Sequence, residues 1–143
     1  MRANIFGAIK ERLDDDIRLR VKNHILAKYQ RIDIVKPVRG MFNYRCHENA
    51  IQYAFENPGM KVIEVFQVEL SGAHLHYINQ NEHGEYLETT LGWKSRLYEY
   101  YYVRELVPDD YDCIGWIFDN VVDTWSKEWL KWYHYLFGIH RVC

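Results

Sequence analysis

The chain has 143 residues, of which 48% are hydrophobic, and this is enough apolar material for one domain with a buried core. Its formal net charge is −2 and charges of both signs are interspersed, which argues against a nucleic-acid partner held by a basic surface. No apolar run approaches membrane-spanning length and no apolar signal segment follows Met1, so we expect no membrane partner.

The N-terminal part, residues 1–35, is predicted to be helical. One apolar stripe runs from Ile5 to Leu13 and a second from Ile17 to Ile25. Between the stripes, residues 14–16 are three aspartates, which we interpret as the cap of a second helix rather than as a metal site. Residues 36–40, Lys-Pro-Val-Arg-Gly, then predict a loop.

A helix is predicted to begin at Cys46, in Arg-Cys-His-Glu-Asn-Ala, and to end at Asn57-Pro58-Gly59. A thiol reacts as the thiolate, and the free amides and dipole at a helix start lower its pKa. Cys46 is therefore a candidate nucleophile, although cysteine is more often a small buried hydrophobe. The three cysteines are odd in number and widely spaced, so we expect a reducing cytoplasm.

The next segments predict strands. Residues 61–70 show no clear polar face, so this strand is expected at the centre of a sheet. Residues 73–80 and 85–90 predict a hairpin, which would bring Glu88 beside His74 and His76. An imidazole can take the proton of a thiol while a carboxylate orients the ring. We favour His76 as the base; His74 is interpreted as a packed strand residue or a substrate contact.

These motifs occur together in a recognisable order. They are Cys46-His47-Glu48-Asn49-Ala50, Asn57-Pro58-Gly59, the strand 61–70, His76, Gly84 and Glu88-Thr89-Thr90. In this order, residues 43–92 resemble small bacterial and phage proteins with a reduced papain-like or transglutaminase-like fold. The resemblance implies that Cys46, His76 and Glu88 are nucleophile, base and orienting residue. Glu88 departs from the pattern, which more often has Asp.

The C-terminal part is rich in aromatic residues, which make up 16% of the whole chain. A strand is predicted over 97–106, a turn over 107–110, and a short strand or the approach to a helix over 110–120. Residues 121–136 then predict one amphipathic helix with a bulky aromatic face. This face is expected to join the core; the alternatives are a substrate groove or a dimer interface.

The sequence therefore predicts a single α+β domain: N-terminal helices, a cysteine-bearing helix packed on a small antiparallel sheet, and a C-terminal aromatic helix. The catalytic core is expected over about 40–106 and the aromatic part over about 107–143. This order agrees with a papain-like fold.

The leading functional hypothesis is a cysteine-dependent acyltransferase or hydrolase with a protein or peptide substrate and no cofactor. Candidate oxyanion or substrate contacts are Asn43, Tyr44, Asn49 and His74, together with the Cys46 amide. One alternative is a non-enzymatic protein, for example of a phage, that blocks a host protein through an aromatic surface. Another is a zinc protein using Cys46, His47, His74 and His76, although adjacent Cys and His residues cannot easily share one ion. The oligomeric state stays open.

Overall fold

The computed structural model describes residues 4–142 and shows an α+β fold, as predicted. The α-helices are α1 (Ile5–Lys28), α2 (Cys46–Glu56), α3 (Ile114–Trp129) and α4 (Trp132–Leu136), and two 3-10 helices are η1 (Gly92–Leu97) and η2 (Pro108–Cys113). The strands are β1 (Gln30–Ile32), β2 (Val35–Pro37), β3 (Lys61–Glu69), β4 (Gly72–Gln80), β5 (Tyr86–Glu88) and β6 (Glu99–Leu106). Within the described part of the chain, no helix is both long and apolar enough to cross a membrane.

The strands form one six-stranded sheet in the order β1-β6-β3-β4-β5-β2. Strand β3 is central, as predicted, and β4 and β5 form the predicted hairpin. The expected antiparallel sheet is wrong in one respect, because β2 pairs with β5 in parallel. The loop expected over 36–40 is therefore partly a strand. Pro37 lies in this edge strand, where its missing N–H need not pair with a further strand.

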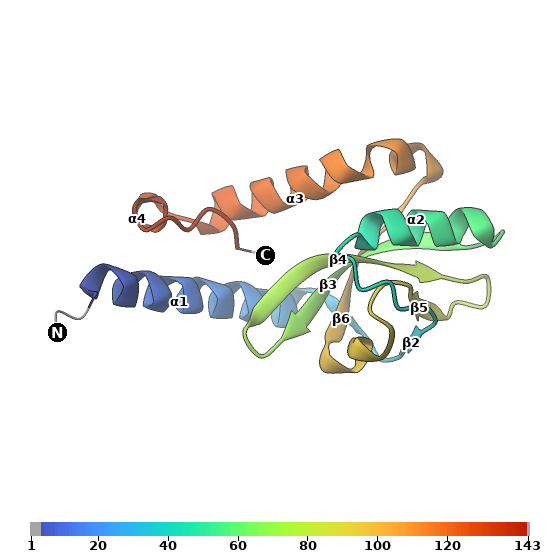
Figure 1. Cartoon of the computed structure of the whole chain (residues 1–143), viewed down its shortest axis with the longest axis horizontal. Coiled ribbons are helices and arrows are strands. Elements are labelled where there is room, and N and C mark those ends of the chain that lie inside the picture. Colours follow the sequence, from blue (N-terminus) through green and yellow to red (C-terminus); the bar gives the residue numbers. More distant parts are fainter. Residues whose placement is uncertain (1–3, 143) are drawn as a thin grey trace.

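Helix α1 is one continuous helix, so the prediction of two N-terminal helices is wrong. Asp14 and Asp16 cap nothing, because they lie within α1 and form ion pairs with Arg18 and Arg20 one turn later, at 3.0 and 3.2 Å. The cap is instead Asn4, whose side-chain oxygen accepts a hydrogen bond from the third helical amide. The first turns of α1 extend beyond the sheet (Figure 1).

The predicted C-terminal helix is interrupted. Leu130 adopts an extended conformation between α3 and α4 and is buried in the core. The helix restarts at Trp132, where the Lys131 amide donates to Nδ1 of His134 at 2.8 Å. Residues 110–120 contain no strand and belong to η2 and α3. Trp125 packs against Phe66 of β3, so this part of the aromatic face joins the core, as expected.

The two faces of the sheet have different partners, and this places the site. Helices α1, α2 and α3 pack on the face that carries Val62, Phe66 and Val68. The opposite face curls on itself and encloses an apolar cluster that contains Ile63, Val65, Ile78, Tyr100 and Ile32. By strand alternation, Gln67 and His76 lie on this second face.

Candidate active site

Cys46 lies at an open edge of the sheet. On β4, strand β5 pairs only with Asn79 and Gln80, so no strand covers the rest of that edge of β4. The first residue of α2 meets β4 there, because Ala50, one turn later, packs against Tyr77 in a buried cluster. The half-buried thiol of Cys46 thereby comes within hydrogen-bonding reach of the His76 ring and of the Tyr77 backbone amide.

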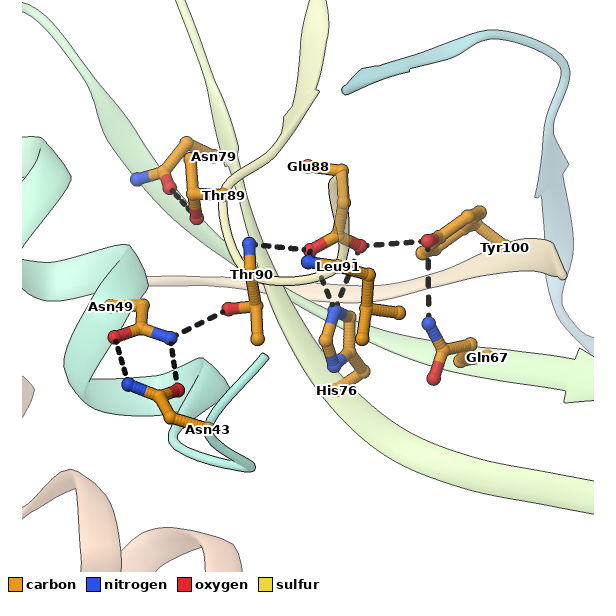
Figure 2. Close-up of polar contacts among 10 residues, drawn as sticks. All are labelled: Asn43, Asn49, Gln67, His76, Asn79, Glu88, Thr89, Thr90, Leu91 and Tyr100. Carbon is orange, nitrogen blue, oxygen red and sulfur yellow. Dashed lines mark hydrogen bonds and ion pairs between the residues drawn. The ribbon is translucent and has the colours of Figure 1, made fainter. Parts of the chain in front are cut away.

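The His76 ring connects the thiol to Glu88. Its Nε2 lies 2.9 Å from Oε2 and 3.1 Å from Oε1 of Glu88, so the other ring nitrogen, Nδ1, is the one left for Cys46. Figure 2 shows this ring nitrogen pointing away from the carboxylate. His76 is buried, with 5% of its surface exposed, and the surrounding structure therefore restricts the orientation of its ring.

The Glu88 carboxylate is completely buried and well hydrogen-bonded (Figure 2). Its Oε1 accepts the backbone amides of Thr90 at 2.9 Å and Leu91 at 3.3 Å, and its Oε2 accepts the hydroxyl of Tyr100 at 2.7 Å. A buried carboxylate is stable as an anion only with such partners. Glu88 is thus held as a fixed negative charge behind His76.

The electrostatics favour a thiolate beside an imidazolium. Burial raises the pKa of the Cys46 thiol, but hydrogen bonds with His47 and His76 outweigh it and lower that pKa to about 6. Burial opposes the charge on His76, yet the negative charge of Glu88 and the contact with Cys46 raise its pKa to about 10. Burial likewise disfavours the Glu88 anion, but the charge of His76 keeps the pKa of Glu88 below its usual value.

A second imidazole, that of His47, also contacts the thiol. A hydrogen bond with Cys46 raises the pKa of His47, against the effect of burial. Its ring stacks on Phe118 of α3, with ring centres 6.0 Å apart. From the sequence, His47 is proposed only as a zinc ligand. Its position next to Cys46 at a helix start was the one signal for this contact.

The predicted contact residues have different surroundings. Asn49 donates through Nδ2 to Asn43 Oδ1 at 2.9 Å and to Thr90 Oγ1 at 3.1 Å, so the two asparagines brace α2 against the loop before it (Figure 2). Tyr44 is fully exposed and has a positive φ of 55°. His74 shares the face of β4 with His76, as predicted, but its Nε2 lies 3.5 Å from Glu69 Oε1.

A cavity of about 480 Å³ opens beside the thiol. Its lining includes Cys46, His76 and His74 together with aromatic and aliphatic side chains. The backbone amide of Cys46 has no hydrogen-bond partner within residues 4–142. Cys46 lines the cavity, so its unpaired amide is a candidate donor to a ligand there.

No group of three His, Cys, Asp or Glu side chains within residues 4–142 could hold a metal ion. Of the four residues considered for zinc, His76 already uses one ring nitrogen for Glu88, and His74 lies near Glu69.

Comparisons of the chain with protein-family models, with curated proteins and with solved structures found no match. The resemblance of residues 43–92 to papain-like or transglutaminase-like proteins therefore stays a prediction. Function must be inferred from the groups around Cys46.

Proposed function

We propose that the protein is a cysteine-dependent acyltransferase or hydrolase of the papain-like or transglutaminase-like type. Cys46 is the nucleophile, His76 the acid and base, and Glu88 the residue that orients His76. The observation that carries the proposal is the alignment of a thiol, an imidazole and a buried carboxylate in the wall of a cavity. The carboxylate is essential to this interpretation, because it distinguishes a triad from a chance Cys–His contact.

The chemistry follows from the charges. The Cys46 thiolate attacks the carbonyl carbon of an amide or thioester, a C–S bond forms, and the carbonyl oxygen becomes an oxyanion. The free Cys46 amide can donate to that oxygen. The imidazolium of His76 gives its proton to the leaving group, and an acyl-enzyme remains. Neutral His76 then takes a proton from water or an amine acceptor, which attacks the thioester and releases the Cys46 thiolate.

An enzyme accounts for the site better than a protein that only binds a partner. A binding surface does not require a thiol with a pKa near 6 or a fully buried carboxylate behind an imidazole. A reactive thiolate of this kind also needs a reducing environment, so we propose that the protein works in the cytoplasm.

The first test is the reactivity of the three cysteines. With limiting iodoacetamide at pH 7, we expect Cys46 to be labelled at least about tenfold faster than the exposed Cys113, and faster than Cys143, because its thiolate fraction is higher. The labelling rate should be half-maximal near pH 6. Mass spectrometry of peptides from a partly labelled sample measures both quantities.

A second step tests acyl transfer itself. Incubation with a small thioester such as phenyl thioacetate should place an acetyl group on Cys46, and Cys46→Ser should abolish this product. Cys113→Ser is the matched control and should leave it unchanged. Preferential labelling of Cys113, or a Cys46 profile that is half-maximal near pH 8.5 as for a free thiol, would overturn the proposal.

A further inference from the structure

The cavity beside Cys46 has an uneven charge distribution. No aspartate or glutamate side chain lines it, although the chain as a whole has a net charge of −2. Its lining includes Lys94, from η1, which has no carboxylate within ion-pair distance among residues 4–142. The Lys94 ammonium instead lies 5.4 Å from the ring centre of Phe42, which also lines the cavity. This positive charge is therefore free to pair with a ligand.

The rest of the cavity is largely apolar. Its aromatic and aliphatic lining residues are Phe42, Tyr44, Leu75, Leu91, Tyr98 and Phe118. A cavity of about 480 Å³ with this lining can hold a small aromatic or branched group. Such a group would gain by leaving water, while an anion on it could reach Lys94.

The neighbouring surface on the α2 side of the site carries carboxylates. A second groove, between α2 and η2, shares His47 with the cavity, and its lining includes Glu48, Glu56 and Asp112. Arg45 and Arg39 pair with the two glutamates, so the groove is only partly negative. An anionic ligand is nevertheless favoured on the Lys94 side and disfavoured on the α2 side.

We propose that the cavity is the acyl pocket and that it selects acyl groups with an apolar or aromatic body and a carboxylate that pairs with Lys94. The inference rests on the proposed function, because it assigns the substrate side of the same thiol. A carboxylate-bearing amide or thioester is then the preferred substrate class over its neutral analogue.

Two alkylating probes of matched shape test the charge preference. The probes are 4-(bromomethyl)benzoate and its neutral analogue 4-(bromomethyl)benzamide. In each case the Cys46 thiolate forms a C–S bond with the benzylic carbon and bromide leaves. The measured quantity is the selectivity, the rate with the benzoate divided by the rate with the benzamide, followed at Cys46 by mass spectrometry. We expect Lys94→Met to lower this selectivity by roughly fivefold, as one short-range charge would.

The controls separate charge from reactivity. Lys127→Met removes the same charge from an exposed position on α3 outside the cavity and should keep the wild-type selectivity. The iodoacetamide rate at Cys46 should be equal in the wild-type protein and in Lys127→Met. The selectivity is a ratio of two rates at the same thiol, so any change in thiol reactivity that Lys94→Met causes cancels in it. High salt should lower the selectivity of the wild-type protein, because it screens the Lys94 charge.

Two outcomes overturn the inference in distinguishable ways. If Lys94→Met keeps the wild-type selectivity while iodoacetamide still reacts rapidly with Cys46, the acyl pocket does not select carboxylates, and the proposed function is unaffected. If iodoacetamide reacts with Cys46 of the wild-type protein no faster than with Cys113, the nucleophile itself is wrong and the pocket assignment falls with it.

Discussion

Glu88 is the residue on which the site depends most. It has no exposed surface, and its carboxylate oxygens interact with two backbone amides, a tyrosine hydroxyl and the ring of His76. All four partners can donate, so the environment is suited to an anion that only accepts. The longer side chain of glutamate, compared with aspartate, still reaches the ring at 2.9 Å.

Glu88→Gln should therefore affect both reactivity and stability. An amide cannot stabilise the imidazolium of His76, so the thiolate fraction of Cys46 and its alkylation rate at pH 7 should fall about tenfold. The side-chain amide also brings an N–H donor into a site whose other groups all donate hydrogen bonds. The unfolding free energy should therefore fall by about 1–3 kcal/mol. Iodoacetamide kinetics and urea denaturation measure the two effects. Glu85→Gln, in the exposed turn before β5, is the control, and equal effects of the two changes would contradict this role of Glu88.

The two strand histidines should differ sharply. His76→Ala removes the ring that interacts with both Cys46 and Glu88, so we expect alkylation of Cys46 at neutral pH to slow by about tenfold or more. His74→Ala changes a half-exposed side chain near Glu69 and should alter the rate by less than about twofold. Iodoacetamide kinetics at pH 7 compare the two. A larger loss for His74→Ala would make His74 the base.

Part of this site, the contact between His76 and Glu88, can be predicted from the sequence. His76 and Glu88 belong to one hairpin, so strand alternation and a short turn suffice to predict that they meet. Tyr100 lies on β6, separated from Glu88 by β3 and β4 in the order β6-β3-β4-β5, and reaches it across the curled face of the sheet. Local spacing contains no information about that strand order, so the Tyr100 contact could not be predicted.

At the scale of elements, two glycines hold the loop before α2 against the segment after β5. Gly92 has a φ of 53°, and a Cβ atom added there would lie 3.1 Å from the Cα of Gly40. The Gly92 amide donates to the Arg39 carbonyl at 3.0 Å, and Gly40 forms a β-bridge with Leu91. This close approach positions Phe42 and Leu91 at the cavity.

Gly92→Ala should loosen this contact. The substitution combines a disfavoured positive φ with a backbone clash, so we expect a loss of about 1–2 kcal/mol in unfolding free energy. Gly115→Ala is the matched control, because nothing lies within 4 Å of a Cβ atom there and the position is helical. That change should be neutral or stabilise the protein by up to about 1 kcal/mol. Urea denaturation of both variants measures their unfolding free energies. Equal values would show that a Cβ atom at position 92 does not clash with Gly40.

The elements that were predicted wrongly from the sequence differ from the prediction for local reasons. The aspartates at 14–16 resemble a helix start, but ion pairs one turn ahead make them compatible with a helix interior. Residues 36–40 contain a proline and so predicted a loop, whereas the edge strand β2 tolerates Pro37. Long, strongly patterned segments such as β3 and α2 were predicted close to their observed bounds.

For the whole molecule, the site lies at the border between two packing regions. The helices cover one face of the sheet, while the other face encloses its own apolar cluster. Cys46 belongs to the helical layer, and His76 projects from the curled face. The charges of the triad therefore form only when these two parts are assembled, and their protonation must be coupled to folding.

The pH dependence of stability should report this coupling. The pKa of Cys46 is lowered to about 6 in the folded protein and lies at about 8.5 in an unfolded chain. Between these values the unfolded thiol binds more protons, so the stability contributed by Cys46 is present above about pH 8.5 and lost as the pH falls through 6. His76 has the opposite sign: its pKa is raised to about 10, so its contribution is lost as the pH rises from about 6.5 towards 10.

Cys46→Ser removes the titration of the thiol, because serine does not titrate. It also removes the contact with Cys46 that helps to raise the pKa of His76, while Glu88 still faces the ring. We expect the unfolding free energy of the wild-type protein, minus that of Cys46→Ser, to increase by on the order of 2 kcal/mol between about pH 6 and pH 8. Urea denaturation under reducing conditions measures it. Cys113→Ser, at an exposed cysteine outside the cavity, is the control for the loss of a thiol. A pH-independent difference between the wild-type protein and Cys46→Ser would mean that the Cys46 thiol keeps an ordinary pKa in the folded protein.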